Sequence, residues 1–293
     1  MNFIPKTLTD YDKLTNQVKF ILDKVGKDVK KLFDANSVGS SDYDNEYGPH
    51  TLLKLAYLNY YLRIFTRIAK SRKDKNGFSK ILFIDAFAGS GLVNIRGTKY
   101  AALGSSTLAA LNGNFDEIIS FEINQNKAEL LSKRLDLLSP GKTTVISGDV
   151  NSEIERIVKE HVSPRTIVLF FVDPEGMEPE FSKLKVLIDR TRYVDIIMNY
   201  TWGIYRLQGR IEKKFADADI SRMRSFLPEY EPGHPPDEAL LKLFENQFGK
   251  PYGNRIEIKS TANKIEYSMI LRVRENSGKN NENHAVWYRQ ECL

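Results

Sequence analysis

The stretch Ile81-Leu-Phe-Ile-Asp-Ala-Phe-Ala-Gly-Ser-Gly91 decides the fold class. Its first four residues are apolar, as is typical of a parallel β-strand that is buried on both faces. Asp85 ends this strand, and Gly89 and Gly91 then let the backbone turn tightly and let a ligand approach where a Cβ atom would clash. Ligands of open α/β folds bind at this carboxyl edge of the sheet. The stretch therefore predicts a strand, a turn and a ligand site at the turn.

Further short apolar runs follow, and segments with helical spacing lie between them. The runs are 117–121, 143–146, 166–172 and 194–198, and the helical segments include 127–138 and 152–161. Strand alternating with helix predicts a doubly wound, mostly parallel sheet with helices on both faces, which is a Rossmann-like α/β fold. Three later runs, at 255–259, 266–273 and 285–288, predict antiparallel C-terminal strands.

The chain before Ile81 predicts helices. Apolar residues between Tyr11 and Phe33, and again between Leu55 and Ala69, recur at spacings of three and four. Residues 36–47 are rich in Ser, Asp, Asn and Gly and predict a loop. We therefore expect an N-terminal helical extension over residues 1–78 and an α/β domain over residues 79–293, with a helical insertion around residues 207–250.

Composition limits the classes of protein that fit. The chain has 293 residues, of which 41% are hydrophobic, so it can bury an ordinary core as one domain with or without an appendage. Its only cysteine, Cys292, excludes an internal disulfide and a cysteine-based metal site. The four histidines lack the spacing of metal ligands, so we expect no metal. The net charge of +5 favours phosphate-bearing partners weakly. Without a membrane-spanning run or a signal peptide core, we expect a soluble, cytoplasmic protein.

Acidic residues follow three successive strands. Asp85 can accept a hydrogen bond from a cationic amino group or neutralise it, whereas it would repel a pyrophosphate. Glu122 is placed to accept from two ribose hydroxyls, and Asp149 to accept from an adenine amino group or to cap the next helix. Glu122 follows the glycines by more than the roughly 20 residues of dinucleotide folds, so we expect an extra loop over 93–104. This pattern favours S-adenosylmethionine as cofactor. The expected contacts are Asp85, Phe87, Gly89, Gly91, Glu122, Ile123, Asp149 and Val150.

The most apolar run ends in Val172-Asp-Pro-Glu-Gly176. Pro174 restricts the backbone there, so the Asp173 carboxylate can face the ligand crevice and orient an amino group for methyl transfer. The alternative is a structural turn in which Asp173 caps a helix. Aromatic residues and arginines follow the next strand, and they suit either base stacking and phosphate contacts or helix packing. We expect Asp173, Pro174 and Asn199 at the reaction, and Glu175, Tyr200, Trp202 and Arg206 at the substrate.

With these residues in place, the chain resembles the three-Cys-motif partner protein family, TcmP, within the class I methyltransferase superfamily. The similarity runs from about Gly48 to Arg210. It rests on GPHTLLKLAYLNYYL, FIDAFAGSG, GSSTLAAL, FEIN, GDV, FFVDPEG and MNYTWGIYR. The resemblance implies a class I methyltransferase fold and a three-Cys-motif protein as partner, often in mobile genetic elements.

One position departs from the family pattern. An aromatic residue tends to follow Asp-Pro, and amino methyltransferases use it to stack on a flipped base; here the residue is Glu175. Three hypotheses stay open. The first is a methyltransferase that acts on an amino group of a nucleic-acid base. The second is a binding or partner module with little or no catalysis, and the third is methylation of a protein or a small molecule.

Overall fold

The computed structural model describes residues 39, 41–48, 51–97, 101–112, 114–214, 216–248, 252–259 and 265–273. The helix expected between Tyr11 and Phe33, the strand expected at 285–288 and Cys292 lie outside this part of the chain. Within it, no helix is long and apolar enough to cross a membrane, and no group of three or more His, Cys, Asp or Glu side chains is arranged to hold a metal ion.

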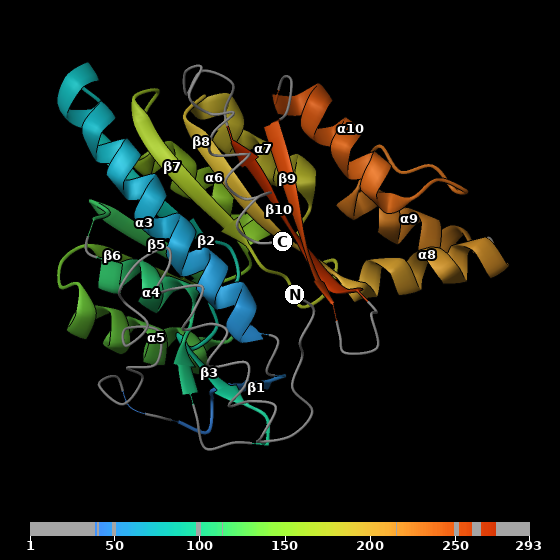
Figure 1. Cartoon of the computed structure of the whole chain (residues 1–293), viewed down its shortest axis with the longest axis horizontal. Helices are drawn as coiled ribbons and strands as arrows, with labels where there is room; N and C mark the ends of the chain where they lie inside the picture. The colour runs from blue at the N-terminus through green and yellow to red at the C-terminus, as the bar shows by residue number, and fades with distance from the viewer. Residues whose placement is uncertain are drawn as a thin grey trace.

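A seven-stranded sheet forms the centre of the molecule, with the strand order β6-β5-β2-β7-β8-β10-β9 (Figure 1). The first five of these strands are parallel, and β10 pairs antiparallel with both β8 and β9. The strands are β2 (Lys80–Asp85), β5 (Glu117–Glu122), β6 (Thr143–Ser147), β7 (Thr166–Val172), β8 (Val194–Thr201), β9 (Tyr252–Lys259) and β10 (Ile265–Val273). The predicted Rossmann-like sheet with antiparallel C-terminal strands is therefore confirmed.

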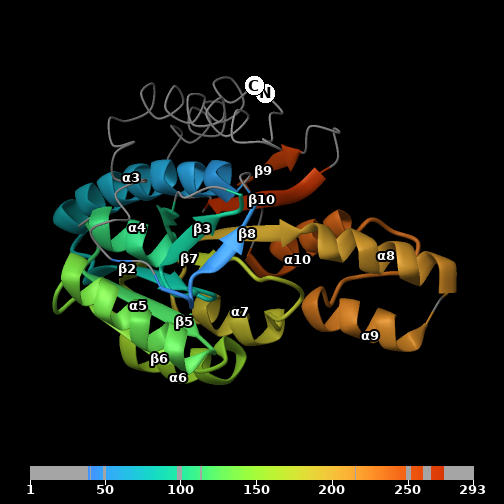
Figure 2. The same ribbon diagram turned by 90° about the horizontal axis from the view of Figure 1, so that it is seen from below.

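Helices cover both faces of this sheet (Figures 1 and 2). One face carries α3 (Thr51–Asn76), α4 (Ser105–Asn112) and α5 (Gln125–Leu138). The other carries α6 (Val150–His161), α7 (Phe181–Arg190), α8 (Trp202–Lys214), α9 (Asp217–Phe226) and α10 (Pro236–Phe248). Because side chains alternate along a strand, the short apolar runs supply both cores.

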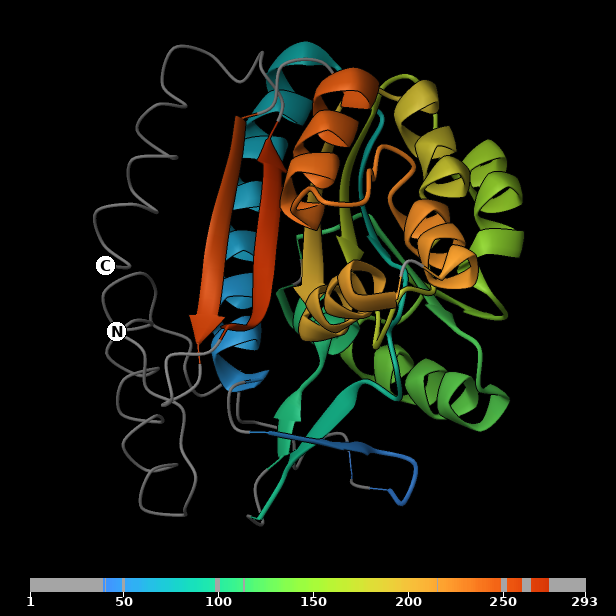
Figure 3. The ribbon, with the colours of Figure 1, turned by 90° about the vertical axis from the view of Figure 1, so that its right-hand side faces the viewer.

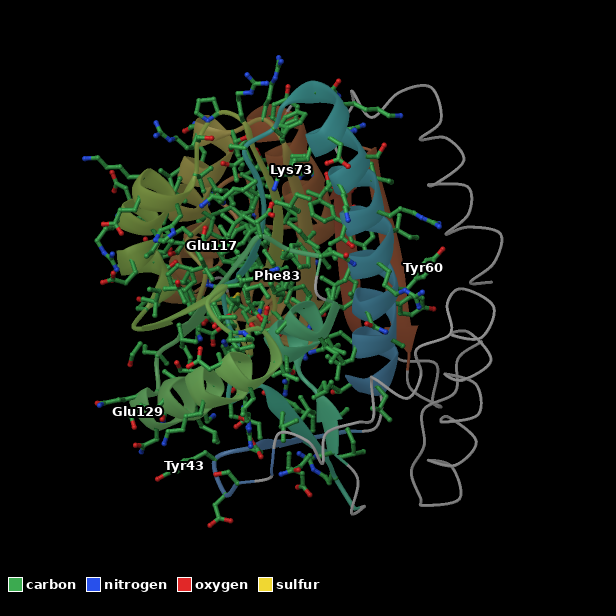
Figure 4. All side chains as sticks on the ribbon, turned by 90° about the vertical axis from the view of Figure 1, so that its left-hand side faces the viewer. Tyr43, Tyr60, Lys73, Phe83, Glu117 and Glu129 are labelled. Atoms are coloured by element: carbon green, nitrogen blue, oxygen red, sulfur yellow. The ribbon has the colours of Figure 1, made fainter. Side chains whose placement is uncertain are left out.

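Strands β2 and β7 show this division most clearly. Phe83 of β2 packs into the core under α3 and α4, and its neighbours Leu82 and Ile84 pack into the opposite core. In Figure 4, Phe83 lies deep among the side chains, while Tyr43 and Glu129 lie at the periphery. All seven residues of β7 are buried, which explains why its sequence, TIVLFFV, has no polar position after its first residue.

A second, small sheet corrects two predictions. It contains β1 (Asn45–Tyr47), β3 (Leu92–Ile95) and β4 (Ala101–Leu103), and it lies at one end of the molecule, as the blue and teal strands in Figure 3 show. Residues 36–47 were expected to form a loop but end in β1, and the loop expected over 93–104 contains most of a hairpin. The first segment was predicted as a loop from its polar composition, and the second from the spacing between Gly91 and Glu122. All three strands have only three or four residues, and β1 pairs with a distant part of the chain, so no local pattern marks them.

The helical segments expected on either side of the α/β core are present where the structure describes the chain. Helix α3 lies within the predicted N-terminal extension, and its residues Leu58 and Leu62 are completely buried in the core over β2 and β7. Helices α8, α9 and α10 fill the predicted insertion and extend from the right-hand side of the sheet in Figures 1 and 2. The domain boundaries themselves stay a prediction.

Candidate functional site

A cavity of about 510 Å³ lies at the carboxyl edge of the parallel strands. Its walls come from β1, the start of α3, and the turns that follow β2, β5, β6 and β7. Strands β5 and β7 lie on opposite sides of β2, so the chain order reverses at this point of the sheet. Such a reversal opens a crevice between the connections, and ligands of open α/β sheets bind there.

Most of the residues expected at the ligand line this cavity. They are Phe87, Gly89, Glu122, Ile123, Asp149, Val150, Asp173 and Glu175. Five other expected residues do not line it, namely Asp85, Gly91, Pro174, Asn199 and Arg206. Arg206 is exposed on α8, and the side chains of Tyr200 and Trp202 lie outside the described part of the structure. Asp85 at the end of β2 and Glu122 at the end of β5 thus lie close to one cavity, although only Glu122 lines it.

Asp85 lies behind the cavity wall. Its side chain is completely buried, and one oxygen accepts hydrogen bonds from the hydroxyls of Ser105 (2.5 Å) and Ser106 (2.7 Å). The other oxygen accepts from the backbone N–H of Phe87 (3.2 Å). Burial raises the pKa of Asp85 to about 6, against the lowering effect of these hydrogen bonds. Ser105 and Phe87 line the cavity, so the structure shows Asp85 holding two wall residues, while its direct contact with a cofactor stays a prediction.

The two glycines of the turn differ in their surroundings. Gly89 has a φ of +62°, and no atom lies within 4 Å of the place where a Cβ atom would stand. At Gly91, with a φ of +88°, a Cβ atom would come within 2.8 Å of both Leu131 and Thr107. Gly89 therefore leaves an open cradle on the cavity wall, whereas Gly91 allows α4 and α5 to pack closely.

Glu122 and Asp149 stand at the carboxyl ends of two neighbouring strands. Glu122 Oε1 accepts a hydrogen bond from the backbone N–H of Asn124 (2.8 Å), which orients its carboxylate at the cavity. Asp149 Oδ1 accepts from the N–H of Asn151 (3.0 Å) and caps α6. The capping alternative for Asp149 is therefore present in the structure, and Asp149 lines the cavity as well.

Asp173 is held by partners from two different elements. Its Oδ2 accepts from Lys54 Nζ of α3 at 2.5 Å, and its Oδ1 accepts from Asn199 Nδ2 of β8 at 2.6 Å. Asn199 is 4% exposed, and its own Oδ1 is buried without a hydrogen-bond partner among the described residues. Pro174, next to Asp173, is buried. The alternative in which Asp173 caps a helix is not the arrangement found, since the residue before α7 is Glu180.

Glu175 contacts β1 directly, and both line the cavity. Its Oε1 accepts hydrogen bonds from the hydroxyl of Tyr47 (2.7 Å) and from Asn45 Nδ2 (3.1 Å). Lys127 Nζ donates to Asn45 Oδ1 (2.6 Å) from α5. Burial and the neighbouring Glu175 carboxylate raise the pKa of Tyr47, so its hydroxyl keeps its proton and acts as a donor. These contacts tie the N-terminal segment to the loop after β7.

The cavity wall carries an excess of negative charge. Among the described residues it is lined by five carboxylates (Glu122, Asp149, Asp173, Glu175 and Glu178) and two lysines (Lys54 and Lys127). A wall with this balance favours a positively charged ligand and disfavours a free phosphate.

A buried ion pair fixes β1 to the rest of the protein. Arg134 of α5 donates to both carboxylate oxygens of Asp44, at 2.6 and 3.0 Å, and also to the carbonyl oxygens of Ser90 and Gly39. The side chains of Arg134 and Asp44 are 2% and 0% exposed. A bidentate pair of this kind sets orientation as well as attraction, so β1 is held in place beside the turn after β2.

Sequence reasoning missed several residues of the site, chiefly Lys54, Tyr47 and Ser105. One signal for Lys54 was present in the sequence. It lies four and eight positions before Leu58 and Leu62, so a lysine occupies a place on the apolar stripe of its helix. No comparable signal marks Tyr47, because its partner Glu175 is distant in the chain.

Comparison with known proteins adds only weak likenesses. No protein-family model matches the chain, including any for the three-Cys-motif partner family, and no curated protein matches it. Among solved structures, it is similar to a putative O-methyltransferase from Klebsiella pneumoniae, with 14% identity, a TM-score of 0.48, and coverage of 91% of this chain and 98% of that chain.

Two more structures are similar at the same level. An O-methyltransferase from Bacillus cereus, in complex with SAH, shares 13% identity with a TM-score of 0.47 over 90% of this chain and 100% of that chain. An rRNA methylase from Streptococcus thermophilus shares 10% identity with a TM-score of 0.42 over 73% of this chain and 95% of that chain. Likenesses this weak assign neither a reaction nor a ligand to this chain.

Proposed function

We propose that this protein is an S-adenosylmethionine-dependent methyltransferase. The observation that carries the proposal is the acidic cavity at the point where the strand order reverses, with the open cradle at Gly89 and the Glu122 carboxylate on its wall. A cationic ligand with a nucleoside part fits both features, because the wall offers carboxylates to charge and to hydroxyls, and Gly89 leaves room for close approach.

The residues that would hold the cofactor are those of the cradle and of the strand ends after β5 and β6. Glu122 would accept hydrogen bonds from ribose hydroxyls, and Ile123 and Val150 would flank an adenine ring. Asp149 caps α6 and would accept from the adenine amino group. Asp85 would act through Ser105 and Phe87, which it holds in place on the wall.

S-adenosylmethionine supplies a methyl group that is already activated on a cationic sulfur. The protein therefore needs chiefly to position the acceptor. Asp173 can accept a hydrogen bond from an N–H of an amino group and so direct the nitrogen lone pair. When bound, the cofactor would supply the methyl group and keep the electron pair of the broken carbon–sulfur bond as a thioether. Asp173 would accept the proton that the acceptor nitrogen loses and pass it to water.

We further propose that the acceptor is an amino group of a nucleic-acid base. The net charge of +5 and the basic residues on the exposed side of α8, such as Arg206 and Arg210, support a nucleic-acid partner. The cavity itself is acidic, so phosphates would be bound outside it. A three-Cys-motif partner protein is proposed from the sequence resemblance alone.

The first test is calorimetry with S-adenosylmethionine on the full chain. We expect binding, and we expect Glu122→Ala to weaken it about tenfold or more, since a charge-assisted hydrogen bond contributes about 1.5–3 kcal/mol. Glu129→Ala is the matched control, because Glu129 lies on the exposed side of α5 at the periphery (Figure 4). Lack of binding by the intact protein would reject the proposal.

A second measurement identifies the acceptor. The protein is incubated with methyl-labelled S-adenosylmethionine and with cellular RNA, DNA and protein fractions, and the label is then traced. Label in RNA or DNA that disappears in Asp173→Ala supports the proposed acceptor. Label in protein or in small molecules instead would replace it.

One observation favours the alternative of a binding module without catalysis. Both oxygens of Asp173 already have partners within the protein, and Glu175 bonds to Tyr47 and Asn45 in the place where an aromatic residue was expected. Under this alternative the chain binds S-adenosylmethionine and transfers no label to any fraction.

A further inference from the structure

Lys54 lies on the cavity wall in an unusual setting for a lysine. Its side chain is 11% exposed, and its Nζ lies 2.5 Å from Asp173 Oδ2 and 5.9 Å from the centre of the Tyr47 ring. The same helix face continues with Leu58 and Leu62, both completely buried. An apolar residue would satisfy the packing pattern here, so the lysine needs another explanation.

A contribution to the stability of the fold does not explain why a lysine occupies this position. Moving an ammonium group out of water is costly, and a buried ion pair regains this cost only in part. Replacing both partners of such a pair by well-packed apolar residues is often neutral or stabilising. The pair between Lys54 and Asp173 is better explained by what it does to the cavity that both residues line.

The hydrogen bonding of Asn199 indicates that the Asp173 carboxylate is fixed in one orientation. The amide nitrogen of Asn199 donates to Asp173, while the amide oxygen is buried with no partner among the described residues. Within the part of the chain that the structure describes, this side chain leaves its own acceptor without a donor and keeps the bond to the carboxylate. Two donors from two elements then fix both oxygens of Asp173.

The charge of the wall suggests a second effect of Lys54. Without this lysine, Asp173 would be one more unpaired carboxylate facing the cavity and would attract any cation bound there. Methyl transfer discharges the sulfur, so a carboxylate that attracts the cationic donor stabilises the bound reactant more than the transition state. Such an attraction strengthens binding and slows the reaction.

We propose that Lys54 is a positioning residue that neutralises and orients Asp173, so that this carboxylate serves the methyl acceptor and not the cationic donor. The inference rests on the proposed methyltransferase function. It assigns to the ion pair a role in discriminating between a cationic and a neutral ligand, which a packing role would lack.

The test compares S-adenosylmethionine, which is cationic at sulfur, with S-adenosylhomocysteine, which is neutral there. In Lys54→Met we expect the affinity for the cationic ligand, relative to the neutral one, to rise about threefold or more by calorimetry, from the unpaired charge at Asp173. We expect kcat to fall about 10- to 100-fold, as for other losses of acceptor orientation. Lys54→Arg should restore most of both properties.

Two further variants sharpen the result. Lys185→Met removes a lysine from the exposed ion pair with Asp189 on α7 and should change neither the affinity ratio nor kcat. The double variant Lys54→Met/Asp173→Asn should return the affinity ratio to the wild-type value, because no unpaired carboxylate is left.

The outcomes separate the two proposals. If the wild-type protein binds neither ligand, the methyltransferase proposal fails. If it binds both and Lys54→Met weakens both in parallel, or leaves the affinity ratio unchanged, the methyltransferase proposal stands and the role of Lys54 is rejected.

Discussion

Gly89 and Gly91 of the turn after β2 have different roles, although they lie only two positions apart in the sequence. Gly89 faces open space on the cavity wall, and Gly91 is enclosed by Leu131 and Thr107. The carbonyl of Gly91 accepts from the hydroxyl of Thr107 (2.7 Å) and from the N–H of Gly104 (2.8 Å). One glycine is therefore needed for ligand access, and the other for packing of the turn against α4 and α5.

This difference predicts that replacement by alanine has different effects at the two glycines. Gly91→Ala should lower the free energy of unfolding by about 2–4 kcal/mol, because it adds overpacking to the cost of a positive φ. Gly89→Ala should cost only about 1 kcal/mol, from the positive φ alone, and should weaken S-adenosylmethionine binding at least tenfold by filling the cradle. Urea denaturation and calorimetry on both variants check this. Equal losses of stability at the two positions would contradict it.

At the scale of elements, the small sheet depends on α5. The pair between Arg134 and Asp44 joins α5 to the segment that leads into β1, and Ser90 Oγ also donates to Asp44 Oδ1 (2.5 Å). This one junction connects the N-terminal segment, the glycine turn and α5. Tyr47 and Asn45 reach Glu175 only if β1 is in place, so the junction also supports the wall of the cavity.

Breaking this junction should loosen β1 before the main sheet. Arg134→Met should lower the free energy of unfolding by about 3–5 kcal/mol, because it leaves the Asp44 carboxylate buried without its partner. Hydrogen exchange should accelerate at the N–H of Arg96, which bonds to the carbonyl of Tyr47 (2.8 Å).

The control is Arg156→Met on the exposed face of α6. Arg156 pairs with Glu153 and Glu160 at 51% side-chain exposure, so its replacement should leave the free energy of unfolding nearly unchanged. Other contacts hold β1 if Arg134→Met lowers the free energy of unfolding as little as Arg156→Met does and hydrogen exchange at the N–H of Arg96 is unchanged.

At the scale of the whole molecule, a charged group lies at the centre of the fold. Asp85 ends the central strand β2, between β5 and β7, and its carboxylate is completely buried. Burial raises its pKa from 3.8 to about 6. Between about pH 4 and pH 6 the folded protein therefore keeps a proton that the unfolded chain has lost, and this group makes the folded state less stable as pH rises through that window.

Replacing Asp85 by Asn should remove this pH dependence. Between pH 4 and pH 7 we expect the free energy of unfolding of the wild type to fall by about 2–3 kcal/mol relative to Asp85→Asn, because the pKa of Asp85 is 3.8 in the unfolded chain and about 6 in the folded protein. Urea denaturation at several pH values measures the difference. Asp189→Asn, at an exposed carboxylate on α7, should follow the wild type at every pH. Parallel curves for the wild type and Asp85→Asn would contradict the prediction.

Local patterns in the sequence were sufficient for the main sheet and for much of the cavity wall. Apolar runs between helical segments predict β2, β5, β7 and β8, because burial on both faces of a sheet demands apolar residues in succession. The run that predicts β6 is less apolar, since this strand lies at the edge of the sheet and has no buried residue. The carboxyl ends of parallel strands lie at one edge, so Glu122, Asp149 and Asp173 were expected near one another from their places after the strands.

Only the tertiary structure decided which side chains meet. Lys54 reaches Asp173 across 119 positions of sequence and Tyr47 reaches Glu175 across 128, and such pairs leave no periodic signal. Packing also keeps Asp85 and Gly91 out of the cavity wall, because side chains of α4 or α5 fill the space beside each of them. The physical reason is that strand and helix patterns report burial along one segment, whereas a site depends on how separate segments pack against each other.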